Sequence, residues 1–243
     1  MKNLGWKGFF INLLGVILGI SLTFGVNSLW QKREEKKKIT EMLILVRNEL
    51  VVNKEWFENQ EKVILEDKYV YGKILEAKGD WKSIPFDKLK IYYARTIYMQ
   101  ISPLTTSAWQ IFQNSELIQK MTDKELIIRL TDCYFWINEI QKHIMTQYWE
   151  PKTKHVAPEI ELYRYFDALM NNKETVFFYN TTTTNEDIWS IFPFIDAIIE
   201  YNIAMLDKHG DYRYDMDEKD KEYESFIEAK VDSALQKRSK NNQ

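Results

Sequence analysis

The hydrophobic and polar positions divide the chain into an apolar N-terminal segment and a longer amphipathic remainder. No charged residue lies between Lys7 and Lys32, a run of 24 positions. As a helix this run is about 36 Å long, whereas the hydrocarbon core of a bilayer is about 30 Å thick. Trp6 and Trp30 stand at its two ends, where aromatic rings meet the headgroup layers. The pattern predicts a transmembrane helix in residues 1–31.

A cleaved secretory signal is the alternative interpretation of this segment, with cleavage near Ser21 to Gly25. We favour the spanning helix because the apolar character continues through Leu29 and Trp30, beyond an h-region of about 7–15 residues. The expected A-x-A-like cleavage site is also missing.

Basic residues follow the apolar segment closely. Two lysines precede it and five basic residues follow it within seven positions: Lys32, Arg33, Lys36, Lys37 and Lys38. Because positively charged flanks stay inside, we predict that the soluble domain lies in the cytoplasm. A periplasmic domain is the alternative. These five residues, with Trp6 and Trp30, form the predicted membrane interface.

The apolar segment also contains closely spaced small residues. Gly15 and Gly19 form a G-x-x-x-G pair, which lets two membrane helices approach each other closely. This spacing predicts a helix-dimer face, although glycine is common in membrane helices in any case.

An amphipathic stripe continues beyond the basic residues. Its apolar positions are spaced alternately four and three apart: Ile39, Leu43, Val46, Leu50, Phe57 and Ile64. Asn53 and Gln60 fill the remaining positions of the stripe. This spacing is that of one helix face, and because no Gly or Pro occurs between Val26 and Tyr71, the transmembrane helix is expected to continue into a long amphipathic helix reaching about residue 71. The stripe can form a coiled-coil stalk or pack onto the chain's own domain, and we favour packing because two of its positions are polar.

The remainder predicts a helical bundle and gives an all-α fold class. Only 8 glycines and 5 prolines are present in 243 residues, which favours long helices. Further helices are expected at 86–100, 106–120, 123–148, 186–208 and 217–236, and residues 177–180 are the only candidate strand. The predicted domains are an anchor (1–31), a juxtamembrane segment with an amphipathic helix (32–71) and a soluble helical domain (72–243).

Two patches of the chain resemble a known family. One is GVILGIS followed by Asn27, Trp30 and REEKKK, and the other holds Ala108-Trp109, Ser115-Glu116-Leu117 and Glu125-Leu126. They are similar to a family of uncharacterised single-pass membrane proteins abundant in Bacteroidota. In that family two Asn precede the Trp and an Asn-Glu pair follows it, whereas Ser28-Leu29 and Gln31-Lys32 stand here. The resemblance implies this single-pass architecture in a bacterial inner (cytoplasmic) membrane, and it implies no catalytic residues.

The sequence has none of the residue spacings that are typical of metal or cofactor sites. His143, His155 and His209 show no metal-ligand spacing, and residues 209–220 lack the sixth-position glycine of an EF-hand loop. No phosphate-binding glycine loop occurs, so no cofactor is predicted. Cys133 lies among large apolar residues and is expected in the core.

Charge and the missing motifs decide between the function classes. Residues 39–243 carry 26 basic and 34 acidic side chains, so nucleic acid is not expected as a partner. We predict a membrane-anchored, non-enzymatic interaction, scaffold or sensor subunit. Its expected partners are the lipid bilayer, a second copy of the chain and an unidentified protein. The alternative is a membrane-tethered enzyme whose active site is not recognisable from sequence.

Overall fold

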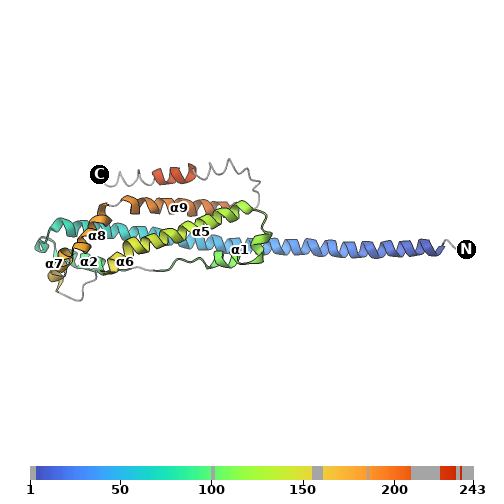
Figure 1. The fold of residues 1–243 in the computed structure, drawn as a ribbon, viewed down its shortest axis with the longest axis horizontal. Helices are drawn as coiled ribbons and strands as arrows, with labels where there is room; N and C mark the ends of the chain where they lie inside the picture. The colour runs from blue at the N-terminus through green and yellow to red at the C-terminus, as the bar shows by residue number, and fades with distance from the viewer. Residues whose placement is uncertain are drawn as a thin grey trace. The chain divides into compact units, whose positions relative to one another are not determined.

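The structure is a computed structural model, and within the residues it describes every regular element is a helix (Figure 1). It describes residues 4–99, 102–154, 161–184, 186–208, 225–233 and 236, and only the backbone of 4–12 and of 187. The helices are α1 (Leu4–Ala77), the 3-10 helix η1 (Trp81–Ser83), α2 (Phe86–Ile97), α3 (Ser107–Gln113), α4 (Glu116–Lys120), α5 (Lys124–Ile144), the π-helix η2 (Met145–Trp149), α6 (Glu150–Lys154), α7 (Leu162–Asn171), α8 (Lys173–Thr184), α9 (Glu186–Asp207) and a terminal helix at 225–233. The all-α fold class is confirmed.

The described residues fall into two compact units. The first joins the chain up to Val46 with Ser107–Asp123, and therefore holds the apolar part of α1 together with α3 and α4. The second joins Arg47–Thr106 with the residues from Lys124 onwards. The predicted domain boundaries at residues 31 and 71 rest on the apolar, basic and amphipathic character of the segments, and they stay a prediction.

Helix α1 is 74 residues long and joins the apolar segment to the amphipathic stripe without a break. It continues six residues beyond the predicted end at Tyr71. The helix ends where Lys78 (φ 48°) and Gly79 (φ 90°) take left-handed conformations. Glycine adopts this conformation without steric strain, which explains a stop here rather than at Gly72 inside the helix.

The amphipathic stripe of α1 is buried along its whole length. All six predicted apolar positions are at most 9% exposed, and the stripe continues through Tyr71 and Ile74, both fully buried. The chain's own helices cover this face, so packing onto its own domain is confirmed over a coiled-coil stalk.

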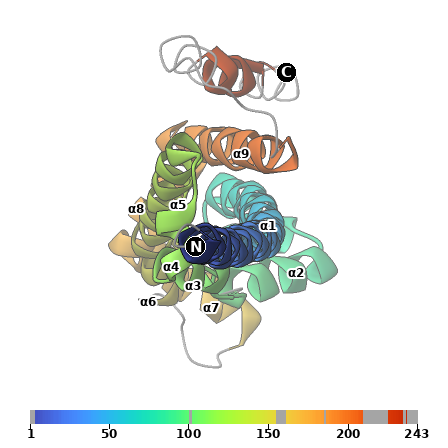
Figure 2. The ribbon, with the colours of Figure 1, turned by 90° about the vertical axis from the view of Figure 1, so that its right-hand side faces the viewer.

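In the second unit, α5 and α9 lie beside α1 (Figure 2), and side-chain contacts show that α5 is parallel to α1 and α9 antiparallel. Contacts to α5 and its continuation pair Glu49 with Tyr134 and Gln60 with Trp149, so the numbers rise together. In the contacts to α9, Arg47 donates to Asp207 Oδ2 (3.2 Å) and Lys54 donates to Glu200 (3.4 Å). The residue numbers rise along α1 while they fall along α9, so these two helices are antiparallel. Because α1 and α5 are parallel, the chain must return along α1 between them.

That return is an extended segment, residues 102–106, held to α1 by side chains. The Trp56 indole donates to the Ser102 carbonyl (2.7 Å), and the Asn53 amide donates to the Thr105 carbonyl (2.8 Å). The Thr105 amide donates back to Asn53 Oδ1 (3.2 Å). Trp56 and the polar position Asn53 therefore both fix the returning chain.

The expected strand at residues 177–180 is wrong, because these residues lie inside α8. The Asn172 side chain accepts from the Glu174 amide (3.0 Å) and caps the helix start. Tyr179 then stacks on Tyr71 of α1, with ring centroids 3.9 Å apart. Burial of these aromatic rings outweighs the strand preference of a short aromatic run.

The other expected helices exist with altered limits. The 106–120 helix is split into α3 and α4, the 86–100 and 186–208 helices end at Ile97 and Asp207, and the 123–148 helix continues through η2 into α6. Helix α7 was not expected. Of the expected terminal helix at 217–236, residues 225–233 and 236 are helical, while residues 217–224 and 234–235 lie outside the described residues.

Candidate functional site

Three polar residues lie at seven-residue intervals within the buried stripe of α1. Asn53, Gln60 and Asp67 are 0%, 1% and 0% exposed. Seven residues make almost two turns of a helix, so all three side chains lie on the same face. Buried polar groups are costly unless they are hydrogen-bonded, so each must have a partner in the fold.

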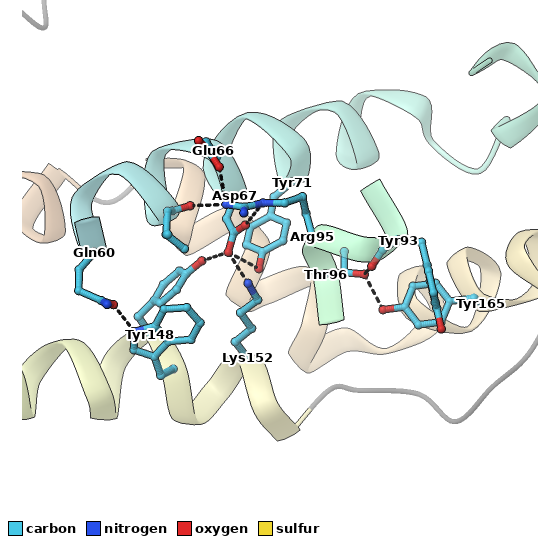
Figure 3. Close-up of polar contacts among 12 residues, drawn as sticks. Gln60, Glu66, Asp67, Tyr71, Tyr93, Arg95, Thr96, Tyr148, Lys152 and Tyr165 are labelled. Carbon is cyan, nitrogen blue, oxygen red and sulfur yellow. Dashed lines mark hydrogen bonds and ion pairs between the residues drawn. The ribbon is translucent and has the colours of Figure 1, made fainter. Parts of the chain in front are cut away.

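Gln60 and Asp67 bind residues from the η2–α6 region. Gln60 Oε1 accepts a hydrogen bond from the Trp149 indole (2.8 Å). Asp67 Oδ2 accepts from the Tyr148 hydroxyl and from the Lys152 ammonium group, and Tyr71 lies 3.5 Å away on its own helix. Figure 3 shows these side chains converging on the Asp67 carboxylate.

Arg95 of α2 completes this group, which we call the Asp67 cluster (Asp67, Tyr71, Arg95, Tyr148 and Lys152). Its guanidinium lies 3.0 Å from Asp67 Oδ1 and 3.0 Å from Glu66 Oε2, and it donates to the Val63 carbonyl (3.0 Å). Two cations therefore face one fully buried carboxylate, while the half-exposed Glu66 carries a second negative charge.

Burial dominates the titration of the cluster. It lowers the pKa of Lys152, and the negative charge of Asp67 opposes that shift only in part. It also raises the pKa of Tyr71 and Tyr148 well above the usual range, and Asp67 raises both further. The tyrosines therefore remain neutral donors, as their contacts with the carboxylate require.

The π-helix η2 places the partners of α1 on one face. The Glu150 amide bonds to the Met145 carbonyl, five residues back, which widens the turn. The next residue is Pro151, which has no amide hydrogen for an i−4 bond. As a result the consecutive residues Tyr148 and Trp149 are both buried, together with Lys152.

The geometry of the Asp67 cluster suits holding helices together rather than catalysis. A lysine with a lowered pKa is a common nucleophile in enzymes. Lys152, however, is only 3% exposed and its ammonium group is bound to Asp67. Buried polar groups of this kind specify one helix register, because any shift would leave charges unpaired. We interpret the cluster as the connection that joins α1, α2 and α6.

The second feature is an apolar groove of about 510 Å³ on the surface of the second unit. It is lined by Trp136, Glu139, Ile140 and His143 of α5, Ser190, Ile191 and Phe194 of α9, and Val231 of the terminal helix. The Trp136 and Phe194 rings meet edge to face, 5.3 Å apart. An exposed groove with aromatic walls is typical of a surface that binds another molecule.

The predicted membrane-interface residues on α1 are exposed wherever their side chains are described. Trp30 is 70% exposed, and Lys32, Arg33, Lys36, Lys37 and Lys38 are all exposed. The side chain of Trp6 lies outside the described residues. A Cβ atom built on Gly15 or Gly19 would meet nothing within 4 Å, so the predicted dimer face is open.

Among the described residues, the candidates for chemistry named from the sequence form no common site. Cys133 is fully buried, and burial raises the pKa of its thiol. His143 of α5 lines the apolar groove. His155, His209 and the acidic residues 211–220 lie outside the described residues. Among the described side chains, no group of three or more His, Cys, Asp or Glu residues is placed to hold a metal.

Sequence reasoning missed the Asp67 cluster, although a signal was present. Asn53 and Gln60 were recognised as polar positions of the stripe, and Asp67 repeats their seven-residue spacing. The partners Arg95 and Lys152 come from distant segments, and no local pattern marks them.

Comparison with known proteins adds no identity to these features. No protein-family model, no curated protein and no solved structure matches the chain. The resemblance to the Bacteroidota membrane family therefore stays a prediction.

Proposed function

We propose that this protein is a single-pass, membrane-anchored helical interaction protein, in which α1 spans the bilayer and the helical bundle binds a protein partner. One observation carries the proposal. The large apolar side chains between Leu13 and Trp30 are between 41 and 71% exposed. In the most apolar stretch of 18 residues in this part of α1, no residue is buried. Contiguous apolar surface of this extent is unfavourable in water and favourable in hydrocarbon.

Helix α9 supplies a comparison within the same chain. Ile188–Asp207 is also long and apolar enough to cross a membrane, but 56% of the residues in its most apolar stretch of 18 are buried inside the protein. Its acidic residues Asp196 and Glu200 lie 3.3 and 3.4 Å from Lys54 of α1. These features are those of a core helix, so the proposed topology has one span.

The basic flank supports a cytoplasmic bundle in a bacterial inner membrane. Five basic residues directly follow the apolar run, and such residues resist transfer across the membrane. We would test this by treating intact and lysed spheroplasts with a protease and following the mass of the membrane-bound protein. A bundle protected at full mass until lysis supports the proposal, and digestion in intact spheroplasts would reverse the orientation. A mass short by about the first 25 residues would show a cleaved signal instead.

The proposed mechanism is positioning. A tether raises the local concentration of the bundle near other membrane proteins, so a weak interface suffices for binding. The apolar groove with Trp136 and Phe194 is the surface that we propose for the partner. A Trp136→Ala variant should lose a cross-linked neighbour in intact membranes, whereas Phe177→Ala, an exposed aromatic on α8, should retain it.

Dimerisation through the membrane helix is part of the proposal. Gly15 and Gly19 are four residues apart, and no side chain of the described chain occupies the space beside them. A Gly15→Leu/Gly19→Leu variant should lose a dimer that is stable in mild detergent, and Gly25→Leu is the matched control. An unchanged monomer in all three proteins would refute the dimer.

A further inference from the structure

Some of the charged residues that follow Trp30 form ion pairs and others do not. Glu34 lies 3.2 Å from Lys38, and Glu41 lies 3.8 Å from Lys37, both along one helical turn of α1. Glu35 instead lies 2.7 Å from Lys120 of α4, in the same compact unit. All three acidic residues of this region therefore have a cationic partner.

Three cations of the same region are left over. Lys32, Arg33 and Lys36 are exposed, and no ion pair joins them to an acid among the described residues. Lys32 and Lys36 are four residues apart and Arg33 and Lys36 are three apart, so they lie on one helix face. They lie about 3–9 Å beyond Trp30 along the helix axis. Like charges this close repel each other and favour a bound anion.

Helix α4 determines which cations remain free. Lys32 lies three residues before Glu35, within reach of an ion pair along the helix. Lys120 pairs with Glu35 instead, within a compact unit that also contains the buried Trp109 and Phe112 of α3. The chain thus contributes a lysine from 85 positions away to neutralise an acid next to the free cations.

We propose that Lys32, Arg33 and Lys36 form a binding site for the phosphate group of anionic phospholipids, and that Lys120 is a positioning residue that keeps Lys32 available. The inference rests on the proposed membrane span, which puts these three residues at the depth of the headgroups. Phospholipid is the favoured occupant because the site directly follows the apolar run and Trp30.

The test uses the full chain in nanodiscs of phosphatidylcholine and phosphatidylglycerol. Spin-labelled forms of each lipid report the relative association constant of the protein for the two headgroups. Each basic residue near a membrane surface contributes about a fivefold preference for anionic lipid. Lys32→Gln/Arg33→Gln/Lys36→Gln should therefore lose most of the preference for phosphatidylglycerol. Lys62→Gln/Lys82→Gln/Lys88→Gln removes the same charge from exposed lysines far along the chain and should retain it.

A double-mutant cycle tests the role of Lys120. Lys120→Ala frees Glu35 to pair with Lys32 and should lower the preference about fivefold. Glu35→Gln should change little in the parent protein, because Lys120 already neutralises that acid, but should restore the preference in the Lys120→Ala background. Equal effects of Glu35→Gln in both backgrounds would overturn the positioning role, because they would show no coupling.

Two outcomes separate this inference from the proposed function. A protein that is extracted from membranes by alkaline carbonate has no spanning helix, and both proposals fail. A protein that resists extraction but binds the two spin-labelled lipids equally retains its anchor and overturns the lipid site alone. The lipid site is also overturned if the control triple variant loses as much preference as the Lys32/Arg33/Lys36 variant.

Discussion

The two halves of α1 belong to one continuous helix but lie in opposite surroundings. Between Leu13 and Trp30 apolar side chains cover every face and are exposed. Between Ile39 and Ile74 one face is buried, and that face includes Asn53, Gln60 and Asp67. The half without charged residues is thus the one that the protein does not cover.

This difference shows what polar residues do in each half. In the first half any charge would oppose insertion into hydrocarbon, so charge begins only at Lys32. In the second half the polar groups are bound by partners from other segments, and they determine which helices pack there. Apolar character alone therefore does not identify a core, whereas a regular polar interruption of an apolar stripe does.

The largest expected effect comes from charge in the exposed half. Ile17→Arg/Leu18→Arg should disfavour membrane insertion by about 5–7 kcal/mol, because each arginine at the helix centre opposes it by about 2.5–3.5 kcal/mol. Fractionation with alkaline carbonate should then find the protein outside the membrane pellet. Leu65→Arg, at an exposed position of the other half, is the control and should stay in the pellet. Retention of the double variant would contradict the proposed span.

In the buried half, Asp67→Asn should lower the free energy of unfolding by about 3–5 kcal/mol, because it leaves the buried Lys152 without a carboxylate partner and removes one of the two carboxylates beside the partly buried Arg95. Denaturation followed by tryptophan fluorescence measures the change. Glu66→Gln removes the neighbouring, half-exposed carboxylate and should have an effect of no more than about 1 kcal/mol. Equal effects of the two substitutions would show that the Asp67 cluster does not hold the helices.

Alkaline pH should destabilise the buried half selectively. Burial raises the pKa of Tyr71, Tyr148 and Tyr179 above the value of about 10 that they have when unfolded. Their contribution is therefore present below about pH 10 and is lost above it, by about 1.4 kcal/mol per pH unit for each tyrosine. Tyrosinate absorbance should rise for these residues only together with unfolding. Reversible titration of all the tyrosines in a folded protein would contradict this.

The smallest effect expected concerns the hydrogen bond between Gln60 and Trp149. Gln60→Leu should lower the free energy of unfolding by about 1–3 kcal/mol, because the buried indole N–H loses its acceptor. Asn59→Leu changes the exposed neighbour and should have almost no effect. If Gln60→Leu instead stabilises the protein, the buried polar positions of α1 would specify the helix register without contributing to stability.

Local patterns were sufficient for part of this structure. The apolar run and the four-three spacing predicted a continuous helix to about residue 71, because the length of the run and the spacing of the stripe are both properties of a single helix. The same reasoning missed α7 and assigned a strand to residues in α8, because a short aromatic run has no period long enough to distinguish helix from strand. Burial against Tyr71, which no local pattern shows, decided α8.

The sequence by itself determined the helical class, the exposed apolar segment with its basic flank, and the buried face of α1, because each follows from residues that are neighbours along one helix. Only the tertiary structure decided the partners. It brought Arg95 and Lys152 to Asp67, and Lys120 to Glu35, over separations of 28 to 85 positions. Pairing of charges depends on distance in space, and distance in space between separate helices is set by how their side chains pack.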